Sequence, residues 1–418
     1  MQLTGLGAGL GARLDAALER TCPGDAPLGV AVSGGGDSMA LLLALAARAR
    51  SGGPAIRAVT VDHGLRAGSA DEARAVAETC AGLAIPHETL AWTGWDGRGN
   101  LQDVARRARL SLIADWARGN GIGRVALAHT RDDQAETVLM RLARGAGVDG
   151  LSAMRAERRL LGVTWLRPFL DISRADLRAW LTGQGSRWID DPSNADPRFD
   201  RVQARQVLAA LAPLGITGAG LAETAARLAS ARAALEACTA EAAVSVATED
   251  RGDVVLSRDG LAALPEEIAR RLVVSALCWV SSADYPPRAA ALAETLGALN
   301  AAPRATIHGC LITRDGQSLR ISREASAVAG TVCEPSALWD GRWRVSGPAR
   351  EGDELRALGE NGLSACPDWR ETGLPRASLL ASPAIWRRGR LIGAPLAGRP
   401  DGWHVAPATR LRDRILSH

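Results

Sequence analysis

The chain has 418 residues, an apolar share of 47% and a formal net charge of +4 at pH 7. This length exceeds one ordinary hydrophobic core, so two or three domains are expected, and the apolar share is that of a globular protein, not a disordered one. All 50 of its lysine and arginine residues are arginine, which excludes any ATP-binding loop that depends on a lysine.

The cysteines argue against a disulfide framework and against a zinc ribbon, because they are odd in number and form no CxxC pair. The seven are Cys22, Cys80, Cys238, Cys278, Cys310, Cys333 and Cys366. No apolar run reaches the roughly 20 residues of a bilayer-spanning helix, and the N-terminus lacks a basic-then-apolar signal. We therefore expect a soluble, cytoplasmic protein.

The first 130 residues alternate short apolar stretches with helix-like ones. Strands are expected at 28–32, 56–61, 87–92 and 124–128, and helices at 38–49, 69–82 and 101–118. This alternation is typical of a doubly wound α/β domain with a mostly parallel sheet, which binds ligands outside the carboxyl ends of its strands. Polar clusters follow the first, second and fourth strands: "SGGGDS", "DHGLR" and "HTRDDQAET".

The rest of the chain predicts two further domains. A loop rich in Asp, Asn and Pro covers 187–201, an alanine-rich helix covers 219–245, and helices and short strands continue to about 325. Short strands, turns and tryptophans dominate thereafter. We expect an α/β catalytic domain over 1–214, a mainly helical middle domain over 215–328 and a small α+β C-terminal domain over 329–418.

The stretch "SGGGDS" runs from Ser33 to Ser38, between a strand and a helix. Backbone N–H groups at the start of a helix lack partners and bind anions, and glycine lets the backbone approach a phosphate closely. A GxGxxA pattern within residues 5–13 has no strand before it and is interpreted as a flexible end. A helix cap formed by Asp37 or Ser38 is the structural alternative to anion binding.

This stretch resembles the SGGxDS pyrophosphate loop of the PP-loop ATPases, which split ATP between the α and β phosphates and adenylate an acceptor. The resemblance implies Mg²⁺ held on the pyrophosphate by Asp37. It also implies an ATP-binding loop made of Ser33, Gly34, Gly35, Gly36, Asp37 and Ser38.

Five further motifs follow in order: "TVDHGLR", "NLQDVARRARL", "LAHTRDDQAETVLMRLARGAGVDGLSAM", "RPFL" and "WIDDPSNAD". Together they resemble the tRNA(Ile)-lysidine synthetase family over the first half of the chain. The resemblance implies a ligase that uses ATP and Mg²⁺. It adenylates C2 of the wobble cytidine, nucleotide 34, of an isoleucine tRNA with a CAU anticodon. Free L-lysine then attacks C2 and forms lysidine, which changes the codon and amino-acid identity of the tRNA.

Roles for single residues follow from the same resemblance. Val61 and His63 would lie against the adenosine, and Arg109 would contact the phosphates or the target nucleotide, with Arg106 as the alternative. His129 is expected in catalysis. The lysine-binding residues are expected to be Asp133 and Glu136, and a capping box of Thr130 with Asp133 is the structural alternative. Asp132 is interpreted mainly as a capping residue.

The chain departs from the family pattern at three positions, where it has Gln102, Leu110 and Val202. The polar residues of the loop are expected to order it near the active site, although a plain Asx-turn cluster explains them nearly as well. They are Asp190, Asp191, Ser193, Asn194 and Arg201.

The middle and C-terminal domains are expected to bind tRNA, and a homodimer stays open. In the C-terminal domain, arginines near Trp369 and Trp386 could contact tRNA, although each tryptophan is equally explained by core packing. Three other functions fit the sequence less well. A 2-thiocytidine synthetase needs paired cysteines, a glutamine-fed synthetase needs a nucleophilic cysteine, and an RNA-binding module without catalysis leaves "SGGGDS" and "HTRDDQAET" unexplained.

Overall fold

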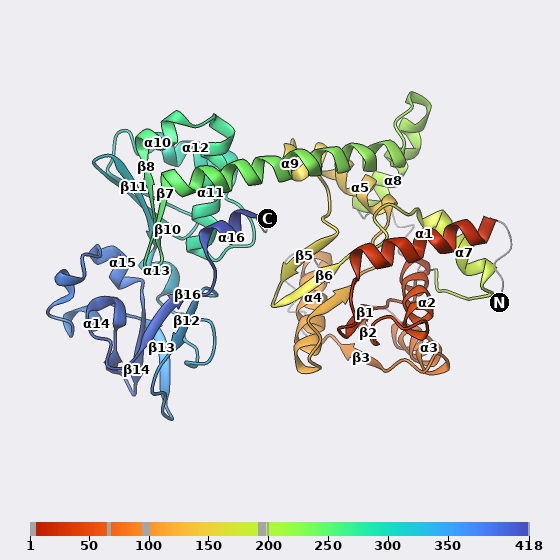
Figure 1. Cartoon of the computed structure of the whole chain (residues 1–418), viewed down its shortest axis with the longest axis horizontal. Coiled ribbons are helices and arrows are strands. Elements are labelled where there is room, and N and C mark those ends of the chain that lie inside the picture. The colour runs from red at the N-terminus through yellow and green to blue at the C-terminus, as the bar shows by residue number, and fades with distance from the viewer. Residues whose placement is uncertain (1–5, 65–67, 94–100, 191–197, 199, 417–418) are drawn as a thin grey trace. The chain divides into compact units, whose positions relative to one another are not determined.

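The computed structural model describes residues 6–64, 68–93, 101–190, 198 and 200–416 (Figure 1). The chain divides into two compact units, Met1–Arg232 and Ala233–His418. Each unit has its own buried hydrophobic cluster. The finer division into three domains stays a prediction.

The first unit is built on a six-stranded sheet of order β3-β2-β1-β4-β6-β5. Its strands are β1 (Leu28–Ala31), β2 (Ile56–Asp62), β3 (His87–Ala91), β4 (Arg124–Ala126), β5 (Glu157–Leu160) and β6 (Val163–Leu166). Five strands are parallel, and β5 is an antiparallel edge strand beside β6. The four strands and the doubly wound fold predicted from the sequence are confirmed. The β5–β6 hairpin was not predicted, because "ERRL" carries too little apolar signal for a strand.

The helices of this unit flank the sheet or follow it. They are α1 (Leu6–Thr21), α2 (Gly36–Arg50), α3 (Ser69–Gly82), α4 (Leu101–Gly119), α5 (Arg131–Leu142), α6 (Val148–Leu151), α7 (Arg174–Gly183) and α8 (Asp200–Leu211), followed by the 3₁₀ turn η2 (Ala212–Leu214). Helix α9 (Gly218–Val246) contains the division between the two units.

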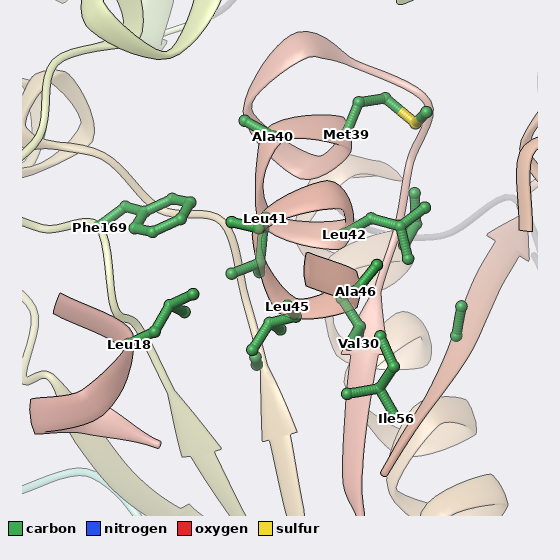
Figure 2. Packing of buried hydrophobic residues seen from close by; sticks show 14 of the residues in the cluster. Leu18, Val30, Met39, Ala40, Leu41, Leu42, Leu45, Ala46, Ile56 and Phe169 are labelled. Atoms are coloured by element: carbon green, nitrogen blue, oxygen red, sulfur yellow. The ribbon is translucent and has the colours of Figure 1, made fainter. Parts of the chain in front are cut away.

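Helix α2 is apolar on most faces because it is covered on several sides. Leu41, Leu42 and Leu45 are each at most 1% exposed. Figure 2 shows them among Leu18 of α1, Val30 of β1 and Phe169. Such all-round burial explains why the helix after the glycine turn lacks a polar stripe. It also fixes the start of α2 rigidly against the end of β1.

The strand order places the polar motifs together. Strands β1 and β4 are neighbours, with Leu28 paired to Arg124 and Val30 to Ala126, although β2, β3 and their helices separate them in sequence. Such a reversal of winding is a topological switch point, and the carboxyl ends of the two strands border one crevice. The sheet therefore brings "SGGGDS" and "HTRDDQAET" to the same edge.

The second unit combines helices with antiparallel sheets. A five-stranded sheet of order β7-β8-β11-β10-β9 contains β7 (Ala247–Asp250), β8 (Asp253–Ser257), β9 (Arg304–Ile307), β10 (Cys310–Asp315) and β11 (Ser318–Arg323). Its helices are α10 (Arg258–Ala263), α11 (Glu266–Ser281), α12 (Ala289–Ala298) and α13 (Ala325–Val328). Helix α11 packs its buried face, including Leu272 and Leu277, into the cluster formed with this sheet.

The C-terminal part of this unit consists of two small sheets, β12-β16 and β13-β14-β15. The strands are β12 (Trp343–Ser346), β13 (Asp353–Ala357), β14 (Pro383–Arg387), β15 (Arg390–Gly393) and β16 (His404–Pro407). Short helices join them: α14 (Gly359–Ser364), η3 (Trp369–Thr372), α15 (Arg376–Leu380), η4 (Pro395–Ala397) and α16 (Leu411–Leu416). Trp339, Trp343 and Trp403 are buried here, so they serve packing.

Among the described helices, none taken singly is long and apolar enough to cross a bilayer. Within the described ranges, one bent pair, Asp200–Leu214 with Gly218–Val246 at 98°, passes that test of length and composition.

Candidate active site

The glycine turn lies between β1 and α2. Gly34 has a φ of +83°, which glycine adopts without a steric penalty. A methyl group on Gly34 would lie 3.0 Å from Cδ1 of Ile189. The N-cap of α2 is Gly35, which has no side chain with which to cap the helix. The structural alternative, in which Asp37 or Ser38 caps α2, is therefore not observed, and the first N–H groups of the helix are left for an anion.

The two serines of the turn hold it closed. The Ser38 hydroxyl accepts from the backbone N–H of Ser33 at 3.1 Å and donates to the carbonyl of Gly35 at 2.9 Å. The hydroxyl oxygens of Ser33 and Ser38 are 3.2 Å apart. These bonds give the predicted ATP-binding stretch one defined conformation before any ligand binds.

The first residues of the Asp-rich loop support the turn from one side. The backbone N–H of Ile189 donates to the carbonyl of Gly34 at 3.0 Å. A methyl group on Gly36 would contact Arg178 and Trp188, each at 3.5 Å. Asp190 pairs with Arg178 at 2.5 Å. The predicted loop residues Asp191, Ser193 and Asn194 lie outside the described residues.

Asp37 is the second residue of α2 and is largely buried. Its Oδ2 accepts from Nε of Arg174 at 3.0 Å, while its Oδ1 has no partner among the described residues. Burial raises the pKa of Asp37 above its ordinary value, and Arg174 opposes that rise. The carboxylate therefore gains from a further positive charge beside it.

Asp133 and Glu136 lie in the first two turns of α5 and are 8% and 1% exposed at the side chain. The predicted capping box is present, since Oδ2 of Asp133 accepts from the backbone N–H and the hydroxyl of Thr130, both at 2.8 Å. Burial opposes the charged form of Asp133, but Arg174, Arg201 and the Thr130 N–H hold its pKa below the ordinary value. Capping thus uses one oxygen of Asp133 and leaves Oδ1 for other cations.

Three arginines reach these two carboxylates. Asp133 Oδ1 accepts from Arg201 at 3.1 Å and lies 3.4 Å from Arg174. Glu136 Oε1 accepts from Nε of Arg205 at 2.6 Å and lies 3.5 Å from Arg174. Its Oε2 is buried without a partner in the described part of the chain. The expected lysine-binding residues are therefore ion-paired within the protein.

Arg174 touches all three acidic residues, and sequence reasoning missed it. It is the first residue of α7, after the N-cap Ser173, where a positive charge is disfavoured by the helix dipole. An arginine at that position was the available signal for a specific acidic partner. Asp132 accepts from the backbone N–H of Arg174 at 2.8 Å. Asp132 therefore does cap a helix, but the helix is α7 and not its own.

The other predicted residues lie among arginines. Burial, with Arg167 next, lowers the pKa of His129 to about 3, so its imidazole is neutral. Burial also lowers the pKa of Arg109 to about 10, and the like charges of Arg106 and Arg201 add to the effect. Arg109 keeps its charge at neutral pH, because a pKa of about 10 lies well above 7. An anion placed among these guanidinium groups would relieve their repulsion.

His63 and Val61 lie at the carboxyl end of β2. The His63 ring meets Trp92 edge to face, with ring centroids 5.6 Å apart. Burial lowers the pKa of His63, and Arg109 lowers it further, which places Arg109 near this strand end. Val61 pairs with Leu90 of β3 and packs against the cluster under α4. These residues offer an apolar and aromatic surface beside the arginines.

Two of the departures from the family pattern have packing roles. Leu110 packs against the buried cluster that includes Trp116. Val202 is 8% exposed, so an apolar residue suits its place in α8. The side chain of Gln102 lies outside the described residues.

The cysteines offer no reactive thiolate among the buried positions. Burial raises the pKa of Cys22 and Cys80 to about 11 and that of Cys310 to about 12.

Within the described ranges, no group of three or more His, Cys, Asp or Glu side chains could hold a metal ion alone. Two cavities, of about 340 and 190 Å³, are lined by residues of the second unit.

The C-terminal arginines differ in how they are held. Arg387 forms two bonds with Asp353, at 2.7 and 3.1 Å, and Arg376 pairs with Glu360. The guanidinium of Arg370 lies 4.5 Å above the Trp369 ring. Of these three arginines, Arg370 alone has no acidic partner among the described residues.

Comparisons with a family model and with known proteins all indicate one family. Residues 11–211 match the model of a PP-loop domain. The chain is 53% identical to the tRNA(Ile)-lysidine synthase of Ruegeria pomeroyi, with 94% of each chain covered. It is 42% identical to the enzyme of that name from Methylobacterium nodulans, over 72% of this chain and 91% of the relative. With that of Wolbachia pipientis wMel it shares 34% identity over 75% of each.

Proposed function

Because the chain belongs to the tRNA(Ile)-lysidine synthase family, we propose that it attaches free L-lysine to C2 of the wobble cytidine of an isoleucine tRNA with a CAU anticodon. The chain is an enzyme of the kind that uses ATP to modify tRNA. One observation carries the proposal. The uncapped glycine turn, which carries Asp37, lies at the same edge of the sheet as two buried carboxylates, those of Asp133 and Glu136. All three carboxylates contact the guanidinium of Arg174.

ATP is the ligand we assign to the glycine turn. The free N–H groups at the start of α2 and the hydroxyls of Ser33 and Ser38 would hold its phosphates. Mg²⁺ fits Asp37, because one carboxylate together with phosphate oxygens is a usual donor set and Oδ1 of Asp37 is buried without a partner among the described residues. When bound, Mg²⁺ would neutralise charge on the departing pyrophosphate.

The first step we propose is adenylation of the base. O2 of the cytidine attacks the α phosphorus of ATP, the bond to the β phosphate breaks, and pyrophosphate leaves. Arg109 suits this step, since it keeps its charge although burial lowers its pKa to about 10. Its positive charge would stabilise the negative charge that grows on the α phosphate. His63 and Val61 would lie against the adenosine.

The second step is attack by lysine. The side-chain nitrogen of lysine, as the neutral amine, forms a bond to C2, AMP leaves with its oxygen, and the nitrogen passes a proton to a carboxylate of the site, for which Oε2 of Glu136 is suited. Asp133 and Glu136 would hold lysine by its positive charge, because Oδ1 of Asp133 is not used by the helix cap and Oε2 of Glu136 has no partner among the described residues. His129 enters this step as a neutral imidazole, which would position the base or the ribose by a hydrogen bond and would not carry a charge.

The adenylated tRNA is the species that tests this order of events. We expect [α-³²P]ATP to label an isoleucine tRNA transcript with a CAU anticodon when lysine is absent. Addition of L-lysine should discharge the label as AMP. A matched transcript with uridine at the wobble position is the control and should stay unlabelled. Labelling that persists after lysine is added would contradict the proposed acceptor chemistry but not the use of ATP.

A further inference from the structure

Arg174 is placed to connect the ATP end of the site to the lysine end. Its Nε bonds to Asp37 at 3.0 Å, its Nη2 lies 3.4 Å from Asp133 and its Nη1 lies 3.5 Å from Glu136. Each nitrogen of one guanidinium thus faces a different carboxylate. Asp37 belongs to the glycine turn, whereas Asp133 and Glu136 belong to α5.

The backbone of Arg174 is fixed, while its side chain is partly exposed. The backbone N–H bonds to Asp132 at 2.8 Å, and the helix is capped by Ser173. The side chain is 22% exposed, unlike Glu136, which is 1% exposed. Since an arginine side chain rotates about several single bonds, the guanidinium can change partners without a change in the fold.

The two other arginines that bind these carboxylates do not connect Asp37 to α5. Arg201 bonds to Asp133 and Arg205 bonds to Glu136, and both come from α8. These two bonds lie at the lysine end of the site. Arg174 is therefore the residue through which a change at Asp37 would reach Asp133 and Glu136.

From this geometry we infer that Arg174 is a positioning residue that couples ATP binding to lysine binding. The inference rests on the proposed function. Without nucleotide, Arg174 occupies Asp133 and Glu136 and competes with the ammonium group of lysine. A bound triphosphate offers Arg174 an anionic partner beside Asp37, and the guanidinium turns toward it. Asp133 and Glu136 then each face one arginine instead of two, so lysine meets less competition and ATP raises the affinity for lysine.

Binding of L-lysine, measured by calorimetry with and without the α,β-methylene analogue of ATP and Mg²⁺, tests this inference. Neither reaction step occurs with this analogue in the absence of tRNA. For the wild type we expect the analogue to tighten lysine binding on the order of tenfold, a usual size for coupling between sites. For Arg174→Gln we expect tighter lysine binding than wild type without the analogue, and a coupling factor near one.

Matched variants separate coupling from a general loss of structure. Arg201→Gln removes another cation from Asp133 and should tighten lysine binding too, but it should keep the coupling factor. Arg20→Gln, which removes an exposed ion pair with Asp171, should resemble wild type. Arg174→Lys keeps the charge but cannot reach three carboxylates at once, so it should show reduced coupling even if Arg174→Gln fails to fold.

The outcomes distinguish the inference from the function on which it rests. Lysine binding that is coupled in Arg174→Gln as in wild type overturns the inference. The inference is also overturned if the analogue does not change the lysine affinity of the wild type. It is overturned as well if Arg174→Gln weakens lysine binding by the same factor with and without the analogue. If the wild type binds the analogue but no lysine, the proposal that lysine is the attacking amine is overturned, and the inference about Arg174 is overturned with it.

Discussion

At the scale of single residues, the site separates two electrostatic environments. Asp37, Asp133 and Glu136 face guanidinium groups within 2.6 to 3.5 Å. By contrast, Arg109 lies near Arg106 and Arg201, and His129 lies near Arg167 as well as Asp133. Burial together with these arginines lowers the pKa of both His129 and Arg109. One environment suits ammonium groups and the other suits phosphates, which matches a reaction that joins an amine to an adenylated base.

The neutral state of His129 predicts a pH dependence of stability. Its pKa is about 3 in the folded protein, against 6.5 in the unfolded chain. Between these values the unfolded chain binds a proton that the folded protein does not, so the free energy of unfolding falls as pH falls below 6.5. For this one group the slope is at most about 1.4 kcal/mol per pH unit.

Urea denaturation at pH 7 and pH 5 measures this effect. His129→Asn cannot take up the proton, so we expect it to lose less stability than wild type over that interval. Equal losses in the two proteins would show that His129 is not held neutral by its surroundings.

At the scale of elements, the start of α5 combines a structural role and a binding role in one side chain. Oδ2 of Asp133 completes the capping box with Thr130, and Oδ1 faces Arg201. Sequence reasoning offered capping and lysine binding as competing explanations. The cap is confirmed, and lysine binding stays a prediction. A carboxylate has two oxygens, so the two roles do not exclude each other.

Removal of the cap should destabilise the protein and loosen Asp133. Thr130 is fully buried, and its hydroxyl donates to Asp133 and accepts from the Asp133 N–H. We expect Thr130→Ala to cost about 1 kcal/mol of stability relative to Thr130→Ser, which keeps the hydroxyl. Thermal unfolding of the two variants measures the difference. Equal melting temperatures would show that the box contributes nothing to the stability of α5.

Sequence periodicity predicts where helices and strands lie better than it predicts which side chains contact one another. The four parallel strands, the helices between them and the turn from Ser33 to Ser38 follow from local apolar patterns and glycine. The β5–β6 hairpin does not, because Arg158 and Arg159 break the apolar pattern of an edge strand. The partners Arg174, Arg201 and Arg205 come from helices 41 or more residues beyond Asp133, and no local pattern specifies which arginine meets which acid.

At the scale of the whole molecule, the first unit holds every residue that we assign to chemistry. Its winding reverses between β1 and β4, and this reversal brings together segments about 100 residues apart in the chain. The second unit contributes antiparallel sheets and exposed arginines such as Arg370 over Trp369. We assign tRNA contact to it as a proposal, since stacked arginine and tryptophan suit phosphates and unpaired bases.

The central claim is that this chain transfers lysine to one particular tRNA. The direct measurement is incorporation of labelled L-lysine, with ATP and Mg²⁺, into an isoleucine tRNA transcript with a CAU anticodon. A methionine tRNA with the same anticodon and an Asp37→Asn enzyme are the controls. We predict incorporation into the isoleucine tRNA alone, reduced at least on the order of 10²-fold by Asp37→Asn. ATP cleavage without incorporation of lysine would contradict the account.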